Sequence, residues 1–214
     1  MAPLLELRNI ACDIVVLRGK SGCGKTTLLK CIAHLVLYDG HIFYRGSPPK
    51  ALGIPVFRTK ILYVPQRPSM LPGTPRDFLN TISSLEAHKA HAHAPTDDPF
   101  TRALDISRKW DLDVSLWDRD WSNLSGGEAQ RIALAIALGL NTAELILLDE
   151  PTSALDSVST AAVEKYLLHE VRSADTTLKA MVWITHSDEQ GSRMGNKFIQ
   201  ITAGGCIEEP IPPV

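Results

Sequence analysis

The sequence predicts an α/β fold built on a mixed, mostly parallel sheet. Apolar, strand-like runs alternate with segments of helical spacing along the chain. A glycine-rich loop stands between one such run and one such segment, and a later apolar run ends in two acids. In sheets of this kind ligands bind where the carboxyl ends of the strands meet. We therefore expect the functional residues to follow the strands.

The N-terminal part of the chain contains four predicted strands and one helix. Leu4–Ile10 is predicted as a short strand, and Ile14–Leu17 is an apolar, β-branched run typical of a buried strand. Leu28–Leu37 has helical spacing, and His41–Tyr44 and Ile61–Val64 are further short strands.

The middle of the chain is predicted to be helical. Arg76–Ala94 and Thr101–Trp110 have helical patterns, and Ser125 opens a longer helix that reaches about Leu140. A helix-rich insertion of this kind predicts a separate lobe. We expect a lobe over residues 76–140 and an α/β core over residues 1–75 and 141–214, together one domain over residues 1–214.

The C-terminal part returns to alternating strands and helices. Leu145–Leu148 and Ala180–Ile184 are continuous apolar strands, with an amphipathic helix at Ser157–Ser173 between them. Phe198–Thr202 and Cys206–Glu208 flank two glycines, which is typical of a hairpin.

Composition excludes several classes of protein. The chain has 214 residues, with 22 Lys and Arg against 24 Asp and Glu, so no basic excess favours a nucleic-acid partner. The four cysteines form no CxxC pair, no apolar run reaches the length of a membrane span, and the N-terminus lacks the features of a signal peptide. A reduced, cytoplasmic protein is the expectation.

The glycine-rich loop has the spacing of a phosphate-binding loop. Gly19-x-x-x-x-Gly24-Lys25-Thr26 follows a predicted buried strand and precedes a predicted helix, as that motif requires. Its backbone N–H groups would surround phosphate, Lys25 would reach the β- and γ-phosphates, and the Thr26 hydroxyl would bind Mg²⁺. The predicted nucleotide-binding residues are Gly19, Lys20, Ser21, Gly22, Cys23, Gly24, Lys25, Thr26 and Thr27.

Two acids end the apolar strand at Leu145–Leu148. Asp149 is placed to hold Mg²⁺, directly or through water, and Glu150 is placed to polarise an attacking water. Phosphoryl transfer needs both of these functions, because the phosphate charge must be neutralised and the nucleophile oriented.

A further motif resembles that of a known family. Leu124-Ser125-Gly126-Gly127-Glu128 resembles the signature sequence of ATP-binding cassette (ABC) ATPases. Gln66 resembles the Q-loop glutamine, Ser153–Asp156 the D-loop, and His186 the switch histidine. The resemblance implies a P-loop NTPase core, a helical signature-motif lobe and an antiparallel β sub-sheet that is shortened here.

The resemblance also implies a mechanism. Two copies would close head to tail on two ATP molecules, with Ser125, Gly126 and Gly127 of one copy facing the γ-phosphate bound by the other. Glu150 would be the base or water-positioning group, and His186 would contact the γ-phosphate. Gln66 would sense Mg²⁺ and water as a catalytic and metal-binding residue. ATP and Mg²⁺ are the implied cofactors, and a homodimer is the implied assembly.

A transporter of this family would need a separate integral-membrane permease, which would hold the chain at the cytosolic face of a membrane. Pro65–Leu79 resembles the segment that receives a permease helix, and Met70 and Leu71 suit such a partner or packing against the lobe. The narrower resemblance is to bacterial iron-export ATP-binding subunits, which implies export of a metal or small solute.

One region departs from the family pattern. Only Ala11-Cys12-Asp13 separates the two N-terminal strands, and no Tyr, Trp or Phe precedes Tyr38, so none lies ahead of the glycine-rich loop to stack on adenine. Loss of such a stack costs on the order of 1–3 kcal/mol of base binding. This departure leaves open a truncated or non-catalytic ATP-binding regulatory cassette. A soluble ABC ATPase that does not act in transport is a separate alternative.

Overall fold

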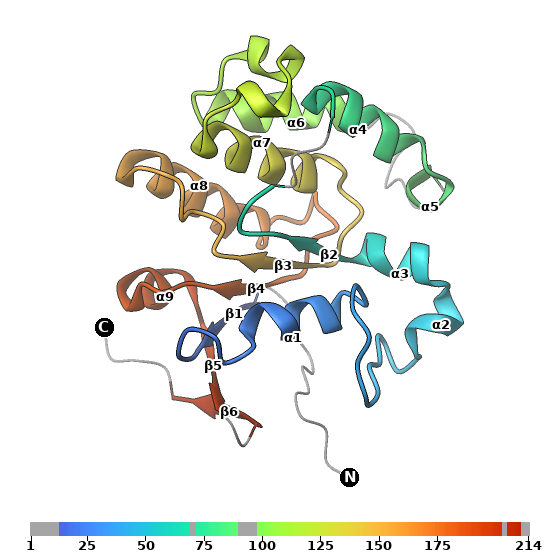
Figure 1. Cartoon of the computed structure of the whole chain (residues 1–214), viewed down its shortest axis with the longest axis vertical. Coiled ribbons are helices and arrows are strands. Elements are labelled where there is room, and N and C mark those ends of the chain that lie inside the picture. Colours follow the sequence, from blue (N-terminus) through green and yellow to red (C-terminus); the bar gives the residue numbers. More distant parts are fainter. Residues whose placement is uncertain (1–12, 69–71, 90–97, 203–204, 211–214) are drawn as a thin grey trace.

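The computed structural model describes residues 13–68, 72–89, 98–202 and 205–210. In these ranges a six-stranded sheet has the order β2-β3-β4-β1-β5-β6 (Figure 1). Every neighbouring pair from β2 to β5 is parallel, and β6 pairs antiparallel with β5. The predicted α/β fold with a mixed, mostly parallel sheet is confirmed. The strands are β1 (Asp13–Arg18), β2 (Ile61–Val64), β3 (Leu145–Asp149), β4 (Ala180–Ile184), β5 (Lys197–Thr202) and β6 (Gly205–Glu209).

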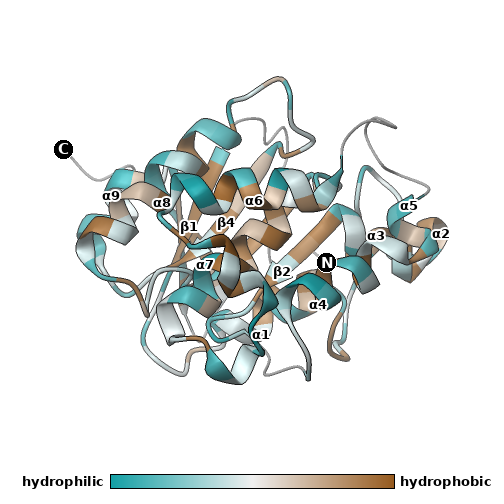
Figure 2. Cartoon of the chain, turned by 90° about the horizontal axis from the view of Figure 1, so that it is seen from above, coloured by the Kyte–Doolittle hydropathy of each residue, from teal (hydrophilic) through white to brown (hydrophobic). Residues whose placement is uncertain are grey.

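Helices cover both faces of this sheet (Figure 1). On one face Leu29 and Phe57 pack with alternate side chains of the strands such as Leu147, and on the other face Ile132 and Val163 pack with the intervening ones. In Figure 2 the strands are coloured mainly hydrophobic, whereas the helices carry both hydrophobic and hydrophilic residues. The helices are α1 (Lys25–Ile32), α2 (Pro49–Leu52), α3 (Ile54–Lys60), α4 (Pro75–Ser84), α5 (Glu86–Lys89), α6 (Pro99–Lys109), α7 (Gly126–Gly139), α8 (Ser157–Glu170) and α9 (Asp188–Met194).

Three local predictions were wrong. Helix α1 ends at Ile32 rather than Leu37, because His34 takes a left-handed backbone with φ of 57° that stops the helix. Only an isolated bridge between Tyr44 and Ser47 forms where a strand was expected at residues 41–44. The helix predicted over residues 76–94 is interrupted at Leu85, whose extended backbone separates α4 from α5 (Glu86–Lys89), and residues 90–94 lie outside the described residues.

Some predicted features stay outside the described residues or untested. The strand predicted at residues 4–10 lies outside them, so the antiparallel pairing that the structure describes is that of β5 with β6 and the Tyr44–Ser47 bridge. Helices α4 to α7 follow β2 and precede β3 in the chain. The division at residues 76–140 into a lobe and a core remains a prediction.

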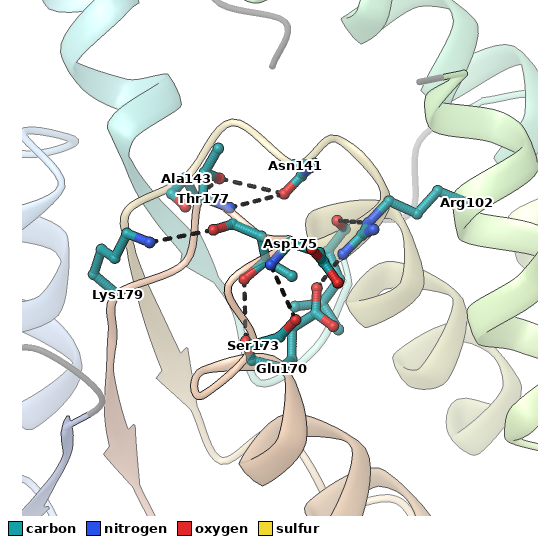
Figure 3. A network of polar contacts seen from close by, with 10 residues as sticks. Arg102, Asn141, Ala143, Glu170, Ser173, Asp175, Thr177 and Lys179 are labelled. Atoms are coloured by element: carbon teal, nitrogen blue, oxygen red, sulfur yellow. Dashed lines mark hydrogen bonds and ion pairs between the residues drawn. The ribbon is translucent and has the colours of Figure 1, made fainter. Parts of the chain in front are cut away.

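A polar network joins α6 to the end of α8, as Figure 3 shows. The Arg102 guanidinium pairs with the carboxylate of Glu170, and its Nε donates to the carbonyl of Leu138 at 3.3 Å. The Glu170 side chain is only 5% exposed. Nearby, the Asn141 carboxamide accepts a 3.1 Å bond from the backbone N–H of Thr177. Because a buried carboxylate needs a partner, this ion pair holds α6 on α8.

Arg102→Ala is therefore expected to lower the free energy of unfolding by about 3 kcal/mol, because it leaves Glu170 buried and unpaired. Urea unfolding followed by circular dichroism measures the change. Lys89→Ala is the matched control, since Lys89 pairs with Glu86 where both side chains are largely exposed, and it should cost less than about 1 kcal/mol. Equal losses in the two variants would contradict this role of Arg102.

Candidate nucleotide-binding and catalytic site

Four parallel strands end side by side and bring the predicted site residues to one edge of the sheet. In the strand register Leu17 of β1 and Asp149 of β3 both lie opposite Ile184 of β4, and Val64 of β2 lies opposite Leu148. The glycine-rich loop, Gln66, Glu150 and His186 directly follow these four strand ends. Residues far apart in the sequence therefore reach a common edge.

The loop after β1 has the backbone of a phosphate-binding loop. Gly19, Gly22 and Gly24 have φ values of 152°, 78° and 96°, which L side chains rarely adopt. A Cβ atom at Gly19 would lie 2.7 Å from the Cys23 sulfur, so the loop also needs glycine there for space. The Lys25 ammonium lies inside the loop and donates to the carbonyls of Gly19 at 2.8 Å and Lys20 at 3.1 Å.

The N-terminus of α1 is open to an anion. Its first residue follows Gly24, which offers no side-chain cap, and its first turn holds no acid. Helices α4, α6, α7, α8 and α9 instead begin after Thr, Ser or Asp residues whose side chains accept a backbone N–H. The residues Lys20, Ser21, Gly22, Thr26 and Thr27 are exposed, and Cys23 and Gly24 are half-buried. Uncapped N–H groups and exposed hydroxyls fit a nucleotide phosphate.

The three predicted catalytic side chains meet. The Glu150 carboxylate accepts a 2.7 Å bond from Nε2 of Gln66 at one oxygen, and its other oxygen lies 2.8 Å from Nε2 of His186. Glu150 itself has a left-handed backbone with φ of 49°, which turns the chain sharply after β3. A cavity of about 300 Å³ adjoins Glu150 and His186 and is also lined by Ser153 and Thr185. The carboxylate is therefore oriented beside a space that admits water.

Asp149 is buried at the end of β3 and accepts a 2.9 Å hydrogen bond from the Tyr63 hydroxyl. Sequence reasoning missed Tyr63, although a phenol three residues before Gln66 in an apolar strand was a signal. With the Thr26 hydroxyl and the Gln66 amide oxygen, Asp149 offers the oxygen ligands that Mg²⁺ prefers. The donor set therefore fits Mg²⁺.

The signature residues begin α7 and pack on the D-loop of the same chain. Ser125 and Glu128 form a capping box, in which Glu128 accepts from the Ser125 N–H at 2.7 Å, and these bonds lower the pKa of the Glu128 carboxyl. A Cβ atom at Gly127 would lie 3.0 Å from the Ala154 carbonyl oxygen. The described hydrogen bonds of Ser125 join it to Glu128 and Ala129, not to the phosphate loop, and Ser125 and Gly126 are exposed.

Gln130 is a second residue that sequence reasoning missed. It lies on α7, is 1% exposed and donates hydrogen bonds to the carbonyls of Gln66 and Glu150. A single amide side chain on a buried helix face, next to Ile132 and Leu134, was the signal that could have found it.

Residues 8–153 match the family model described as ABC transporter. The chain belongs to the ABC transporter family. It is 31% identical over 204 residues to the phosphate import ATP-binding protein PstB of Mycoplasma pneumoniae, covering 92% of this chain and 60% of that protein. It is 34% identical over 205 residues to PstB 1 of Lactococcus lactis, covering 92% of this chain and 78% of that protein.

A dimeric ATP-binding cassette solved in a post-hydrolysis state with ADP and Pi has the same fold. Its TM-score is 0.76 at 26% identity, and the likeness covers 95% of this ABC chain and 88% of that one.

The narrower resemblance to iron-export subunits is not supported, because the curated relatives above are phosphate import proteins. Among the described residues no helix is long and apolar enough to cross a membrane, and Met70 and Leu71 lie outside those residues.

Tyr63 predicts part of the alkaline pH dependence of stability. Burial, then the bond to Asp149, raises the pKa of the Tyr63 phenol above its ordinary value of about 10. The folded state then holds this proton more tightly than the unfolded state. The contribution of Tyr63 to the free energy of unfolding is therefore fully present below pH about 10 and is lost as the pH rises further. Tyr63→Phe should lose stability less steeply above pH 10 in urea unfolding. An unchanged slope would contradict the buried contact.

Proposed function

We propose that this ABC chain hydrolyses Mg·ATP as a homodimer and powers a separate membrane permease. The observation that carries the proposal is the Glu150 carboxylate, held by Gln66 and His186 at the same strand ends of the sheet as the phosphate loop. Phosphoryl transfer needs an anion cradle and an oriented carboxylate together, and this edge offers both. The permease would place the chain at the cytosolic face of a membrane.

Each side chain then has a role in the reaction. The N–H groups of the loop and of α1 bind the phosphates, and Lys25 exchanges its bonds to the Gly19 and Lys20 carbonyls for bonds to phosphate oxygens. Thr26, Asp149 and Gln66 would hold Mg²⁺, which would neutralise phosphate charge. Glu150 accepts a proton from the attacking water or orients it, and His186 contacts the γ-phosphate.

The signature residues are proposed to act on the nucleotide of a second copy. Ser125 and Gly126 are exposed at the N-terminus of α7, so the Ser125 hydroxyl and the Gly126 N–H are accessible to the phosphate of another copy. The Ser125 N–H donates to Glu128, and Gly126 and Gly127 pack on Ala154 of the D-loop. The exposed side of Ser125 and Gly126 is therefore accessible to a partner. The dimeric ATP-binding cassette with ADP and Pi supports this arrangement.

Import is the direction favoured by the relatives. The curated relatives are named phosphate import ATP-binding proteins, which replaces the expected export of a metal or small solute. We propose that this chain also powers import and that the permease selects the solute.

A non-catalytic ATP-binding cassette is the second candidate. No Tyr, Trp or Phe precedes Tyr38, so none lies ahead of the phosphate loop, and Phe43 is 64% exposed. ATP affinity would then depend on the phosphate contacts alone, which makes the two variants below decisive.

Lys25→Ala is expected to weaken ATP binding by roughly ten- to a hundredfold, because it removes a charge-assisted hydrogen bond to phosphate. Isothermal titration with ATP measures the affinity. Lys30→Ala, on the last turn of the same helix, is the control and should bind as the unmodified chain does. Equal affinity for both variants would contradict the phosphate loop.

Glu150→Gln is expected to keep ATP binding and to lower the rate of phosphate release by at least about a hundredfold, because the general base is removed. The variant should also accumulate as an ATP-bound dimer in size-exclusion chromatography. Glu144→Gln alters an acid next to the opposite end of β3, paired with Arg45, and should turn over normally. Persistent hydrolysis in Glu150→Gln would remove Glu150 from its role.

A further inference from the structure

Gln130 joins three separate segments of the chain through their backbones. Its Nε2 group donates to the Gln66 carbonyl at 3.1 Å and to the Glu150 carbonyl at 3.0 Å. Its Oε1 atom accepts from the backbone N–H of Ala154 at 3.0 Å. These three partners belong to the Q-loop, the turn after β3 and the D-loop.

The chemistry of the side chain matches its surroundings. A primary amide has two N–H donors and one carbonyl acceptor, which is the set that two carbonyls and one N–H require. Because Gln130 is only 1% exposed, water cannot easily replace it if it is lost. The buried amide is therefore fully used in holding these segments together.

The location of Gln130 connects these segments to the signature motif. It lies one turn into α7, the helix that Ser125 caps and whose Gly127 packs on Ala154. The Glu150 carbonyl also accepts from the Ser153 N–H at 3.2 Å, which tightens the turn between the catalytic carboxylate and the D-loop. A displacement of α7 or of the Gln66 segment should therefore also displace the backbone of Glu150.

We propose that Gln130 is a positioning residue for ATP hydrolysis, an inference that rests on the proposed function. It sets the spacing of Gln66, Glu150 and Ala154, so that the carboxylate of Glu150 stays aligned with the attacking water. It also transmits to Glu150 any displacement of Gln66, which belongs to the segment Pro65–Leu79 that resembles the permease contact of the family.

Two variants separate its bonds. Gln130→Met keeps a side chain of similar length and removes all three hydrogen bonds. Gln130→Glu keeps the acceptor for Ala154 and removes the two donors. Both should lower kcat by about 10- to 100-fold, since small misplacements of reacting groups cost this much, while KM for ATP changes less than about threefold.

Amide hydrogen exchange provides a readout that does not depend on activity. Gln130→Met should speed exchange at the Ala154 N–H, which loses its acceptor, whereas Gln130→Glu should retain protection at Ala154. Ser107→Ala is the matched control: it removes a buried 3.2 Å hydrogen bond from Trp117 in the helical region, so it should lose stability yet keep kcat.

The outcomes distinguish the two proposals. If the unmodified chain shows no hydrolysis that depends on Glu150, the proposed function fails, and the exchange data alone decide whether Gln130 links the three segments. Unchanged exchange in Gln130→Met would overturn the inference. A fall in kcat no larger than that of Ser107→Ala would also overturn it, because the role would then be structural.

Discussion

The parallel pairing of β2, β3, β4 and β1 is the constraint on which the candidate site depends. Side chains on both faces of these strands are buried, so the register is fixed by packing on either side. A slip of one residue would turn Asp149 and its neighbours to the wrong face. Because the register holds, the four segments that follow these strands meet at one edge, and chemistry that no single segment could carry becomes possible there.

Buried polar groups complete what the apolar core begins. Such groups destabilise a fold unless they are hydrogen-bonded, and here the bonds connect functional segments. Tyr63 binds the carboxylate of Asp149, and Gln130 binds three backbone groups around Glu150. Gln190 likewise donates to Thr152 and Glu164 beneath the cavity next to Glu150. Stability and orientation at the site therefore depend on the same bonds.

The sequence predicted the features that local patterns determine. Three such features can be recognised within a few residues. They are the glycine spacing of the phosphate loop, the two acids after an apolar run, and the start of a long helix at Ser125. The sequence did not predict Tyr63 or Gln130, because their partners lie 86 and up to 64 residues away and are chosen by packing. It also missed α2 and α3, which begin with prolines in the first turn and were too short to show a period. The early end of α1 depends on one left-handed residue, His34, which no apolar pattern indicates.

The central claim is that two copies of this chain complete each other's nucleotide sites. Mixing purified Lys25→Ala and Ser125→Ala chains and measuring ATP hydrolysis tests it most directly. In a head-to-tail dimer of one chain of each kind, one site has both an intact phosphate loop and an intact signature motif. We expect the mixture to hydrolyse ATP at a rate above the sum of the rates that the two variants show when measured alone. Activity equal to that sum at every protein concentration would contradict it.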